Sequence, residues 1–245
     1  MELKNKVVII TGGSSGIGEA TAILFAKEGA NVVISYKVNK SGAEKVVSQI
    51  EKFGAKVFMR QADLTIEKEA EELVKFTLEK LNRVDILVNN AGGYIEGDEW
   101  DGTADIWTKS LEQNLVSVMN VSKYAIKEFQ KQQSGVIISV ASRHSISGQF
   151  DSLSYAAAKA GVVNITQAYS KLLFPYGRAN SISPGPVNCG YWLTAPLDEL
   201  EETSAKMPDK KLLEPQTVAN SISFLVLNDK INGQNIILDG GKSLI

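Results

Sequence analysis

The sequence has few of the residues that support metal, thiol or disulfide chemistry. Its 245 residues include one cysteine, Cys189, and one histidine, His144. A single cysteine excludes an internal disulfide and a cysteine-rich zinc site, and it fits a reducing compartment. We therefore expect a cytoplasmic protein with no metal in its site.

An excess of positive charge and a long apolar run are also missing. The 26 Lys and Arg nearly balance the 28 Asp and Glu, for a net charge of −2. Such a balance provides no overall basic field for nucleic acid or an anionic membrane. No apolar run approaches the roughly 20 residues of a membrane span. The first apolar run, Val7–Ile10, comes so early that we expect no leader. The expected partner is a small molecule, without nucleic acid or membrane.

Short β-branched runs alternate with longer amphipathic stretches along the whole chain. The predicted strands are 7–10, 31–35, 56–61, 85–88, 135–140, 178–182 and 235–238. The predicted helices are 17–28, 40–53, 66–81, 103–131, 152–174 and 215–228. Strict alternation predicts an α/β fold with a doubly wound parallel β-sheet and helices on both faces, because parallel strands need crossovers.

No linker, repeat or charge block divides this alternation, so the sequence predicts a single domain over 1–245. Its longest stretch without a clear period is 188–214, which contains the acidic run Asp198–Glu202. Long irregular segments in compact domains are commonly lids or binding loops. We interpret 188–214 as a candidate substrate lid, since it follows a strand end, where open α/β sheets bind ligands.

A glycine-rich loop, Thr11-Gly-Gly-Ser-Ser-Gly-Ile-Gly18, joins the first predicted strand to the first helix. Glycines allow backbone to approach a ligand closely, and the free N–H groups of a helix start attract phosphate. The alternative is an ordinary strand-to-helix turn. Strand before, helix after and first position in the chain favour the phosphate-binding interpretation.

Further motifs follow in a fixed order. They are Asp63-Leu64, Asn89-Asn-Ala-Gly92, Ser142, Tyr155-Ala-Ala-Ala-Lys159 and Pro184-Gly185. With these motifs and the glycine spacing, the sequence resembles the short-chain dehydrogenase/reductase family over nearly its whole length. The resemblance implies a Rossmann-like sheet, a nicotinamide dinucleotide cofactor and a homotetramer.

Tyr155 and Lys159 are spaced to share one face of a helix. An ammonium at that spacing is expected to lower the pKa of the phenol toward neutrality, as a general acid/base requires. The alternative is a solvated helix pair. Tyr36 and Lys40 have the same spacing, but at a strand end, where it does not place two side chains on one face.

By the resemblance, Tyr155 is the general acid/base, Lys159 also grips the nicotinamide ribose, Ser142 bonds the substrate carbonyl and Asn114 supports a proton relay. Ser139 and Ser145 compete with Ser142, and the thirteen-residue step to Tyr155 favours Ser142. The alternative for Asn114 is a polar kink or cap in its helix.

The same resemblance implies a cofactor site. Its residues are Gly12, Ser14, Ser15, Gly16, Ile17, Gly18, Tyr36, Lys37, Asp63, Leu64, Asn90, Ala91, Gly92, Tyr155, Lys159, Pro184, Gly185 and Val187. Asp63 would bond the adenine amino group, or else cap the helix beginning near Thr65. Val187 would offer its N–H to the carboxamide.

NAD-preferring members usually place an acid where Tyr36 stands, and this chain has none. Lys37 and Lys40 could instead meet a 2′-phosphate, or else be solvated loop lysines. We expect NADP preference over NAD.

Four positions depart from the family pattern. They are Ser139 in place of Asn, Ala141 in place of Ser, Cys189 in place of Thr, and a stretch near Gly177 one residue short, which could shift the sixth strand. A thiol is a poorer donor than a hydroxyl, so the Cys189 contact to the carboxamide is weakened.

The substrate is the least specified part. Arg143 and His144 follow Ser142 and could face the pocket, or else be a surface pair; Tyr94, Gln149, Tyr191 and Trp192 could form its walls. We expect a small carbonyl or alcohol substrate, because the acidic run on the lid would repel an acidic carrier protein. The alternatives are a 3-oxoacyl-carrier-protein reductase and a non-catalytic, cofactor-binding regulatory protein.

Overall fold

Seven parallel strands form one sheet in the computed structural model, which describes residues 2–244. The strands are β1 (Val7–Ile10), β2 (Asn31–Tyr36), β3 (Val57–Gln61), β4 (Ile86–Asn89), β5 (Gly135–Val140), β6 (Gly177–Pro184) and β7 (Asn235–Leu238). Their order is β3-β2-β1-β4-β5-β6-β7. The predicted doubly wound α/β fold is confirmed.

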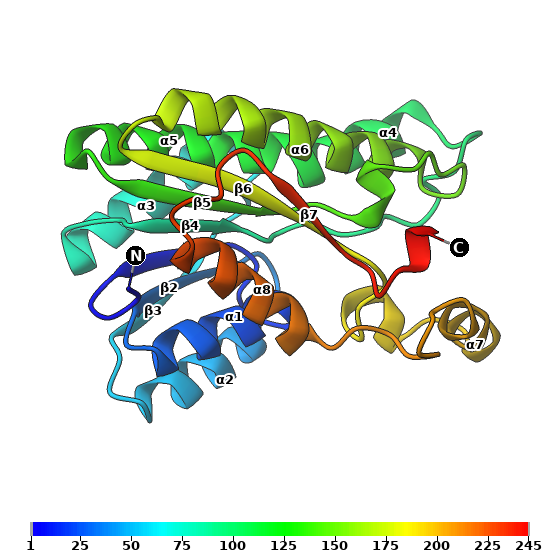
Figure 1. The fold of residues 1–245 in the computed structure, drawn as a ribbon, viewed down its shortest axis with the longest axis horizontal. Coiled ribbons are helices and arrows are strands. Elements are labelled where there is room, and N and C mark those ends of the chain that lie inside the picture. Colours follow the sequence, from blue (N-terminus) through cyan, green and yellow to red (C-terminus); the bar gives the residue numbers. More distant parts are fainter. Residues whose placement is uncertain (1, 245) are drawn as a thin grey trace.

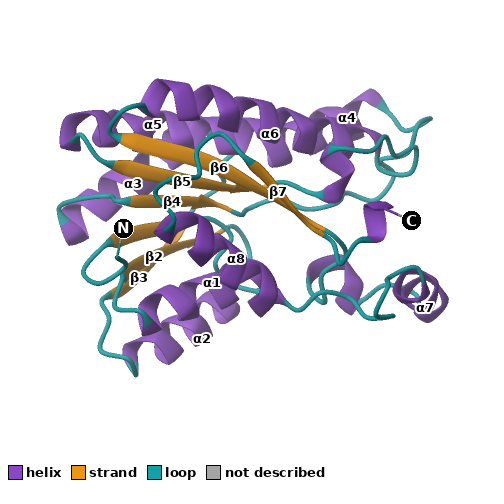
Figure 2. Cartoon of the chain, viewed as in Figure 1, coloured by secondary structure: helices purple, strands orange, loops and turns teal. Residues whose placement is uncertain are grey.

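Helices cover both faces of this sheet (Figures 1 and 2). They are α1 (Gly16–Lys27), α2 (Lys40–Glu51), α3 (Glu67–Leu81), α4 (Ala104–Leu111), α5 (Ser117–Gln132), α6 (Leu153–Leu173), α7 (Leu197–Ala205) and α8 (Pro215–Leu227). Short turns are η1 (Glu112–Val116), η2 (Arg143–Ser145), η3 (Gly190–Leu193) and η4 (Lys242–Leu244). The ends of the predicted elements coincide with these or differ by at most two residues wherever the element itself was expected.

The alternation of side chains along each strand builds two cores. Val8, Ile10 and Ile34 face α1, α2 and α8, whereas Ile9 and Val33 face α3, α5 and α6. Because both faces are covered, the central strands β1, β4 and β5 are apolar along most of their length, as in most parallel sheets. This explains why the sequence shows continuous apolar runs there rather than alternating ones.

The chain reverses direction across the sheet between β1 and β4, its two central neighbours. Crossovers from β1 and from β4 leave toward opposite sides, so the loops after these strands diverge and open a crevice. The loop after β1 is the glycine loop, and the loop after β4 is Asn90–Thr103. The fold therefore places two of the sequence motifs on either side of one crevice.

Two expectations about secondary structure were wrong in detail. The predicted helix 103–131 is three pieces, because a π-helical turn, η1, separates α4 from α5. The segment 188–214 is not irregular, since it contains η3 and α7. No residue of α7 is buried, so the helix has no apolar stripe facing the core. Its sequence therefore lacks the helical period by which the other helices were predicted.

The short stretch near Gly177 does not interrupt the sixth strand. β6 pairs with β5 continuously from Gly135 opposite Gly177 to Val140 opposite Ile182. Within residues 2–244, no helix is both long enough and apolar enough to cross a membrane.

Candidate active site

A cavity of about 870 Å³ opens at the carboxyl end of the sheet. The glycine loop, the residues after β2, β4, β5 and β6, the start of α6 and the 188–214 segment all contribute to its wall. In Figure 1 the segment with α7 and the C-terminal turn lie beyond this end of the sheet. Its wall therefore includes both predicted cofactor residues and predicted substrate residues.

Most of the predicted site residues line this cavity. They are Gly12, Ser14, Ser15, Gly16, Ile17, Tyr36, Lys37, Asp63, Leu64, Asn90, Ala91, Gly92, Tyr94, Ser142, Arg143, His144, Gln149, Tyr155, Lys159, Pro184, Gly185, Val187, Tyr191 and Trp192. Gly18 and Asn114 do not line it, and neither does Lys40.

Gly18 has a packing role instead of a place on the cavity wall. A Cβ there would lie 2.3 Å from the carbonyl oxygen of Gly12 and 2.6 Å from Nδ2 of Asn90. The absence of a side chain lets α1 begin directly against the loop. Gly12 itself has φ +64, a conformation that glycine adopts without strain.

Asn90 and Thr11 fix the shape of the glycine loop. The Asn90 amide donates to the carbonyls of Thr11 at 2.9 Å and Gly12 at 3.1 Å. The Thr11 hydroxyl in turn accepts the N–H groups of Asn90 and Ala91. The two loops of the crevice are therefore bonded to each other, and Asn90 acts through its side chain on the loop.

Tyr155 stands in the first turn of α6, and a buried carboxylate holds that turn. Asp98, on the loop after β4, accepts the N–H of Tyr155 at 2.7 Å and the N–H of Ser154 at 2.9 Å. A negative charge at a helix N-terminus satisfies free N–H groups and interacts favourably with the helix dipole. Asp98 thereby fixes the position from which Tyr155 enters the cavity.

Ser142 faces Tyr155 from the end of β5. Its hydroxyl accepts the N–H of His144 at 3.2 Å, and its nearness lowers the pKa of the Tyr155 phenol. Neither competing serine shares this position: Ser139 is buried in β5, and Ser145 bonds to Ser183. Ser142 and Tyr155 can therefore contact the same small group.

The expected lowering of the Tyr155 pKa by Lys159 was wrong. Burial raises the pKa of the Tyr155 hydroxyl by more than the neighbouring Ser142 hydroxyl lowers it. The Lys159 Nζ lies 5.6 Å from the Tyr155 ring centre and donates to the carbonyl of Val140 at 3.0 Å. Burial also lowers the pKa of Lys159 to about 8.

Asn114 lies one layer behind the cavity wall. The π-turn η1 presents its amide to the loop after β4, where it accepts the N–H of Gly93 at 2.8 Å and donates to the Gly93 carbonyl at 2.9 Å. Gly92 brings this amide close to Lys159, since a Cβ at Gly92 would lie 2.5 Å from Asn114 Oδ1 and 3.5 Å from Lys159 Nζ. Asn114 thus joins η1 to the loop after β4, on the side of that loop that faces Lys159.

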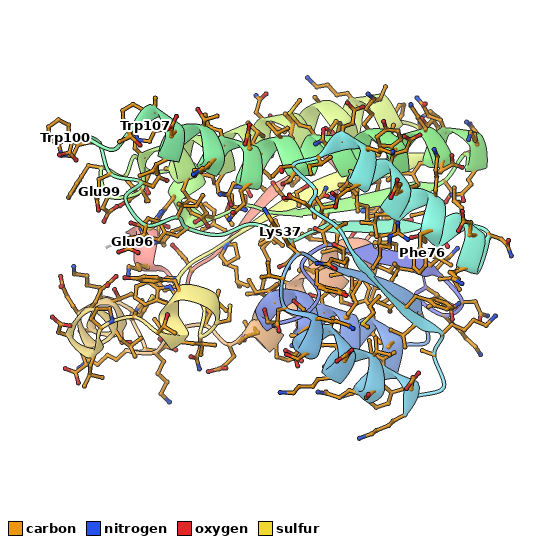
Figure 3. All side chains as sticks on the ribbon, turned by 180° about the vertical axis from the view of Figure 1, so that it is seen from behind. Lys37, Phe76, Glu96, Glu99, Trp100 and Trp107 are labelled. Atoms are coloured by element: carbon orange, nitrogen blue, oxygen red, sulfur yellow. The ribbon has the colours of Figure 1, made fainter. Side chains whose placement is uncertain are left out.

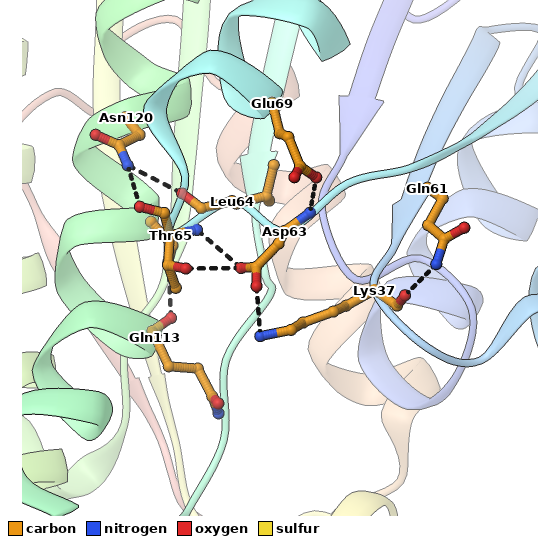
Figure 4. Close-up of polar contacts among 9 residues, drawn as sticks. Lys37, Gln61, Asp63, Leu64, Thr65, Glu69, Gln113 and Asn120 are labelled. Atoms are coloured by element: carbon orange, nitrogen blue, oxygen red, sulfur yellow. Dashed lines mark hydrogen bonds and ion pairs between the residues drawn. The ribbon is translucent and has the colours of Figure 1, made fainter. Parts of the chain in front are cut away.

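The adenine end of the expected cofactor site holds an ion pair. Lys37 Nζ lies 2.7 Å from Asp63 Oδ2, and the other Asp63 oxygen accepts the N–H and hydroxyl of Thr65 (Figure 4). Burial raises the pKa of Asp63, but the bonds from Lys37 and Thr65 together hold it below its usual value. Asp63 does not cap α3, whose N-cap residue is Ile66.

The residues at the expected nicotinamide end fit such a group. Among residues 2–244, the N–H of Val187 has no hydrogen-bond partner. The bonds to Leu213 are made by the residues on either side of Val187: the Asn188 N–H donates to the Leu213 carbonyl, and the Pro186 carbonyl accepts the Leu213 N–H. Gly185 lets the loop after β6 pack against the end of β7, since a Cβ there would lie 3.0 Å from Asp239 Cα. Burial raises the pKa of the Cys189 thiol, which is bonded to the Ile17 N–H, so it is protonated at neutral pH.

Aromatic side chains form one wall of the cavity's outer part. The rings of Tyr94 and Tyr191 meet edge to face at 5.7 Å, and Tyr191 meets Trp192 at 5.3 Å. The Tyr191 hydroxyl bonds to Glu199 of α7, which raises the Tyr191 pKa to about 12. Figure 3 shows Glu96, Glu99 and Trp100 on the same side of the molecule as α7, away from Lys37.

His144 lies inside the cavity rather than in a surface pair. Its ring meets the Tyr155 ring edge to face at 6.0 Å, and its Nδ1 is 3.1 Å from the Ser152 hydroxyl. Burial lowers the His144 pKa to about 4. The ring is therefore neutral at pH 7.

The sequence matches the profile described as short chain dehydrogenase over residues 6–198. A 3-oxoacyl-[acyl-carrier-protein] reductase FabG of Thermotoga maritima is 32% identical, covering 98% of this chain and 99% of its own. A 7alpha-hydroxysteroid dehydrogenase of Escherichia coli K12 is 32% identical, with 98% and 95% covered. A solved short-chain dehydrogenase/reductase of Caenorhabditis elegans with cofactor superposes with a TM-score of 0.92 at 34% identity, covering 100% and 97%. The chain belongs to the short-chain dehydrogenase family. It is accordingly an NAD(P)-dependent oxidoreductase.

In this short-chain dehydrogenase, the serine at position 139, one of the departures from the family pattern, affects the hydrogen bonding of its neighbour Asn89. Ser139 pairs with Asn89 across β4 and β5, and both side chains are buried. Within the described residues, Ser139 Oγ and Asn89 Oδ1 have no hydrogen-bond partner. Serine is shorter than the usual asparagine, so it leaves the neighbouring Asn89 oxygen unmatched.

Several residues of this short-chain dehydrogenase site were not predicted. Asp98, Thr11 and Lys242 are the most important of them. Thr11 was detectable as a hydroxyl at the strand end before the glycines. Asp98 acts across 57 residues, and Lys242 reaches the cavity from the C-terminal turn, so no local pattern marks either.

Proposed function

We propose that this chain is an NADP-preferring reductase or dehydrogenase that acts on a small carbonyl or alcohol, with Tyr155 as the general acid/base. The observation that carries the proposal is the placement of Ser142 and Tyr155 next to each other in the wall of one cavity, which the glycine loop and the aromatic residues also line. Nicotinamide supplies the hydride when bound.

The chain's own residues supply the proton and the polarisation. In the reducing direction, the Ser142 hydroxyl donates to the substrate carbonyl oxygen, and Tyr155 gives its proton to the same oxygen as negative charge develops. The raised pKa of Tyr155 keeps the phenol protonated at neutral pH, as a proton donor must be. Lys159, with a pKa of about 8, can supply a proton near neutral pH to restore the Tyr155 phenol.

Preference for NADP rests on Lys37. It lines the cavity at the end of β2, whereas Lys40 pairs with Glu44 and lies outside it. The Lys37 ion pair with Asp63 is largely exposed, and such pairs contribute little stability, so a phosphate could exchange for it. The glycine loop has Ser15 where a second basic residue is common among NADP users, so Lys37 would act alone.

The deciding test compares Tyr155→Phe with the unaltered protein. We expect Tyr155→Phe to lose turnover of carbonyl substrates by at least about a thousandfold, while NADPH binding stays within a few-fold. A panel of ketones and alcohols, followed at the absorbance band of reduced nicotinamide, gives the rates. Near-full activity of the variant contradicts the mechanism, and inactivity of the unaltered protein on every substrate favours the regulatory alternative.

A 3-oxoacyl-carrier-protein reductase is the second candidate, because relatives with that name cover nearly the whole chain at 32% and 33% identity. Against it, Asp198, Glu199, Glu201 and Glu202 of α7 present acids beside the cavity, and carrier proteins are acidic. Assay with acetoacetyl thioesters of coenzyme A and of carrier protein separates the two.

We also propose a cytoplasmic homotetramer, in which the 188–214 segment covers bound substrate. Sedimentation equilibrium measures the assembly, and a monomer contradicts it.

A further inference from the structure

Arg143 is a half-buried guanidinium in the cavity wall with no partner of its own. It directly follows Ser142 and begins η2. Among residues 2–244, no carboxylate lies within ion-pair distance of its guanidinium and no acceptor is hydrogen-bonded to it. Partly buried arginines are normally paired, because removing a charge from water is costly. Its five donors are therefore available to something inside the cavity.

The two acids nearest Arg143 do not neutralise it by contact. Asp239 and Asp151 both act on Arg143 only through longer-range attraction. Asp239 is committed to the turn η4, where it accepts the N–H of Gly241 at 2.9 Å and of Ser243 at 2.8 Å. Asp151 accepts the Ser152 hydroxyl at 3.4 Å.

Lys242 brings a second positive charge to the same wall. It lies on η4, which Asp239 holds in place, and it lines the cavity while half-buried. Burial lowers the Lys242 pKa, and repulsion from Arg143 and Lys206 adds to this effect, whereas attraction to Asp239 opposes it. Lys242 makes no ion pair within the part of the chain described, whereas Lys206 is paired with Glu202. Arg143 and Lys242 therefore repel each other in the cavity wall, and a bound anion would relieve that repulsion.

His144 adds no charge to this cluster at pH 7, because its pKa is about 4. The acids Glu99 and Glu199 belong to the aromatic side of the cavity, and Glu199 is engaged by Tyr191. The cavity lining thus combines the acids Glu99, Glu199 and Asp151 and the paired Lys206 with the two unpaired cations Arg143 and Lys242.

We propose that Arg143 and Lys242 form an anion subsite, and that the substrate carries a carboxylate or phosphate within a few bonds of its reacting carbon. The closeness follows from the chain, since Arg143 is adjacent to Ser142, which contacts Tyr155. The substrate class rests on the proposed function, but the anion subsite does not.

The test measures binding to protein saturated with NADP+, so that no reduction occurs and the cofactor's phosphate sites are filled. Calorimetry compares two matched pairs of probes: acetoacetate with methyl acetoacetate, and dihydroxyacetone phosphate with dihydroxyacetone. We expect the anion of at least one pair to bind at least about tenfold tighter than its neutral partner. The pair that shows the preference identifies carboxylate or phosphate.

Variants assign that preference to the proposed residues. Arg143→Gln is expected to reduce the anion preference by about tenfold or more, and Lys242→Gln by several-fold. Lys230→Gln removes an exposed lysine outside the cavity and is expected to leave it unchanged. Circular dichroism checks that each variant is folded. If Arg143→Gln is not folded, Lys242→Gln tests the anion subsite, because Lys242 is far from Ser142 in the sequence.

Three results overturn the proposal: no anion preference in the unaltered protein, the same preference in both variants, or anion binding that NADP+ abolishes. Failure of the proposed function is distinguishable, because it appears as unimpaired turnover by Tyr155→Phe or as no turnover at all. Neither of those results changes the binding preference.

Discussion

The carboxylate of Asp98 accepts the backbone N–H of Tyr155 at 2.7 Å and is completely buried. Asp98 also accepts the hydroxyls of Ser154 and Ser110, and its own carbonyl accepts the N–H of Leu153. One loop residue therefore anchors the start of α6 from several directions. Asp98 does not line the cavity itself, so we expect it to act on the proposed chemistry only by positioning Tyr155.

Asp98→Asn is expected to lower kcat by about tenfold or more while the KM for NADPH stays within about twofold. The amide keeps one acceptor oxygen but offers N–H groups to donors, so the first turn of α6 shifts. Stability should fall by about 1–3 kcal/mol, from the donors left unsatisfied. Steady-state kinetics and urea unfolding measure both effects. A loss of stability with unchanged kcat would show that Asp98 has only a structural role.

Lys159→Met is expected to change how stability depends on pH. Lys159 has its pKa lowered from 10.5 to about 8 by burial, so the unfolded chain binds more protons than the folded one between these values. The unaltered protein thereby gains stability from this group as pH rises from about 8 to 10.5, and the variant does not, with a difference of up to about 3 kcal/mol. Thermal melting without cofactor at pH 7 and pH 10 tests this. Parallel pH profiles of variant and unaltered protein would contradict it.

Lys37→Gln and Lys40→Gln form a matched pair for cofactor choice. Both remove a lysine near the end of β2, but only Lys37 lines the cavity. We expect Lys37→Gln to lower the ratio of kcat/KM for NADPH over NADH by about tenfold, since an ion pair with phosphate is lost. Lys40→Gln should leave the ratio within about twofold. An initial preference for NADH in the unaltered protein would remove the premise.

Gly18→Ala is expected to weaken NADPH binding by about tenfold or more. Its Cβ would come within 2.3 Å of the Gly12 carbonyl oxygen, so the loop must move away from α1. Alanine favours a helix by up to about 1 kcal/mol over glycine, so stability alone could change little. Gly148→Ala is the control, because a Cβ there meets nothing within 4 Å. Fluorescence titration with NADPH measures the affinity; equal affinities for both variants would mean that the loop tolerates the clash.

The sequence sufficed for features that depend on neighbours along the chain. The helical spacing of Tyr155 and Lys159, the glycines of 11–18 and the apolar strands of the sheet are local patterns, and the structure has each element where it was expected. The direction of the Tyr155 pKa shift was not predictable, because burial depends on the segments that enclose the phenol. For the same reason Asp98, Lys242 and the separation of Lys37 from Lys40 emerged only from the folded chain.

The 188–214 segment leaves the sheet and returns at the same place. Val187 and Leu213 form a parallel bridge, with Asn188 donating to Leu213 at 2.8 Å and Leu213 donating to Pro186 at 2.9 Å. An excursion closed at its base can change length or sequence at little entropic cost to the rest of the fold. We therefore expect the segment between Val187 and Leu213 to be replaceable without loss of the fold. Transplanting it between relatives would retune which molecules enter, while the sheet, the glycine loop and α6 stay as they are.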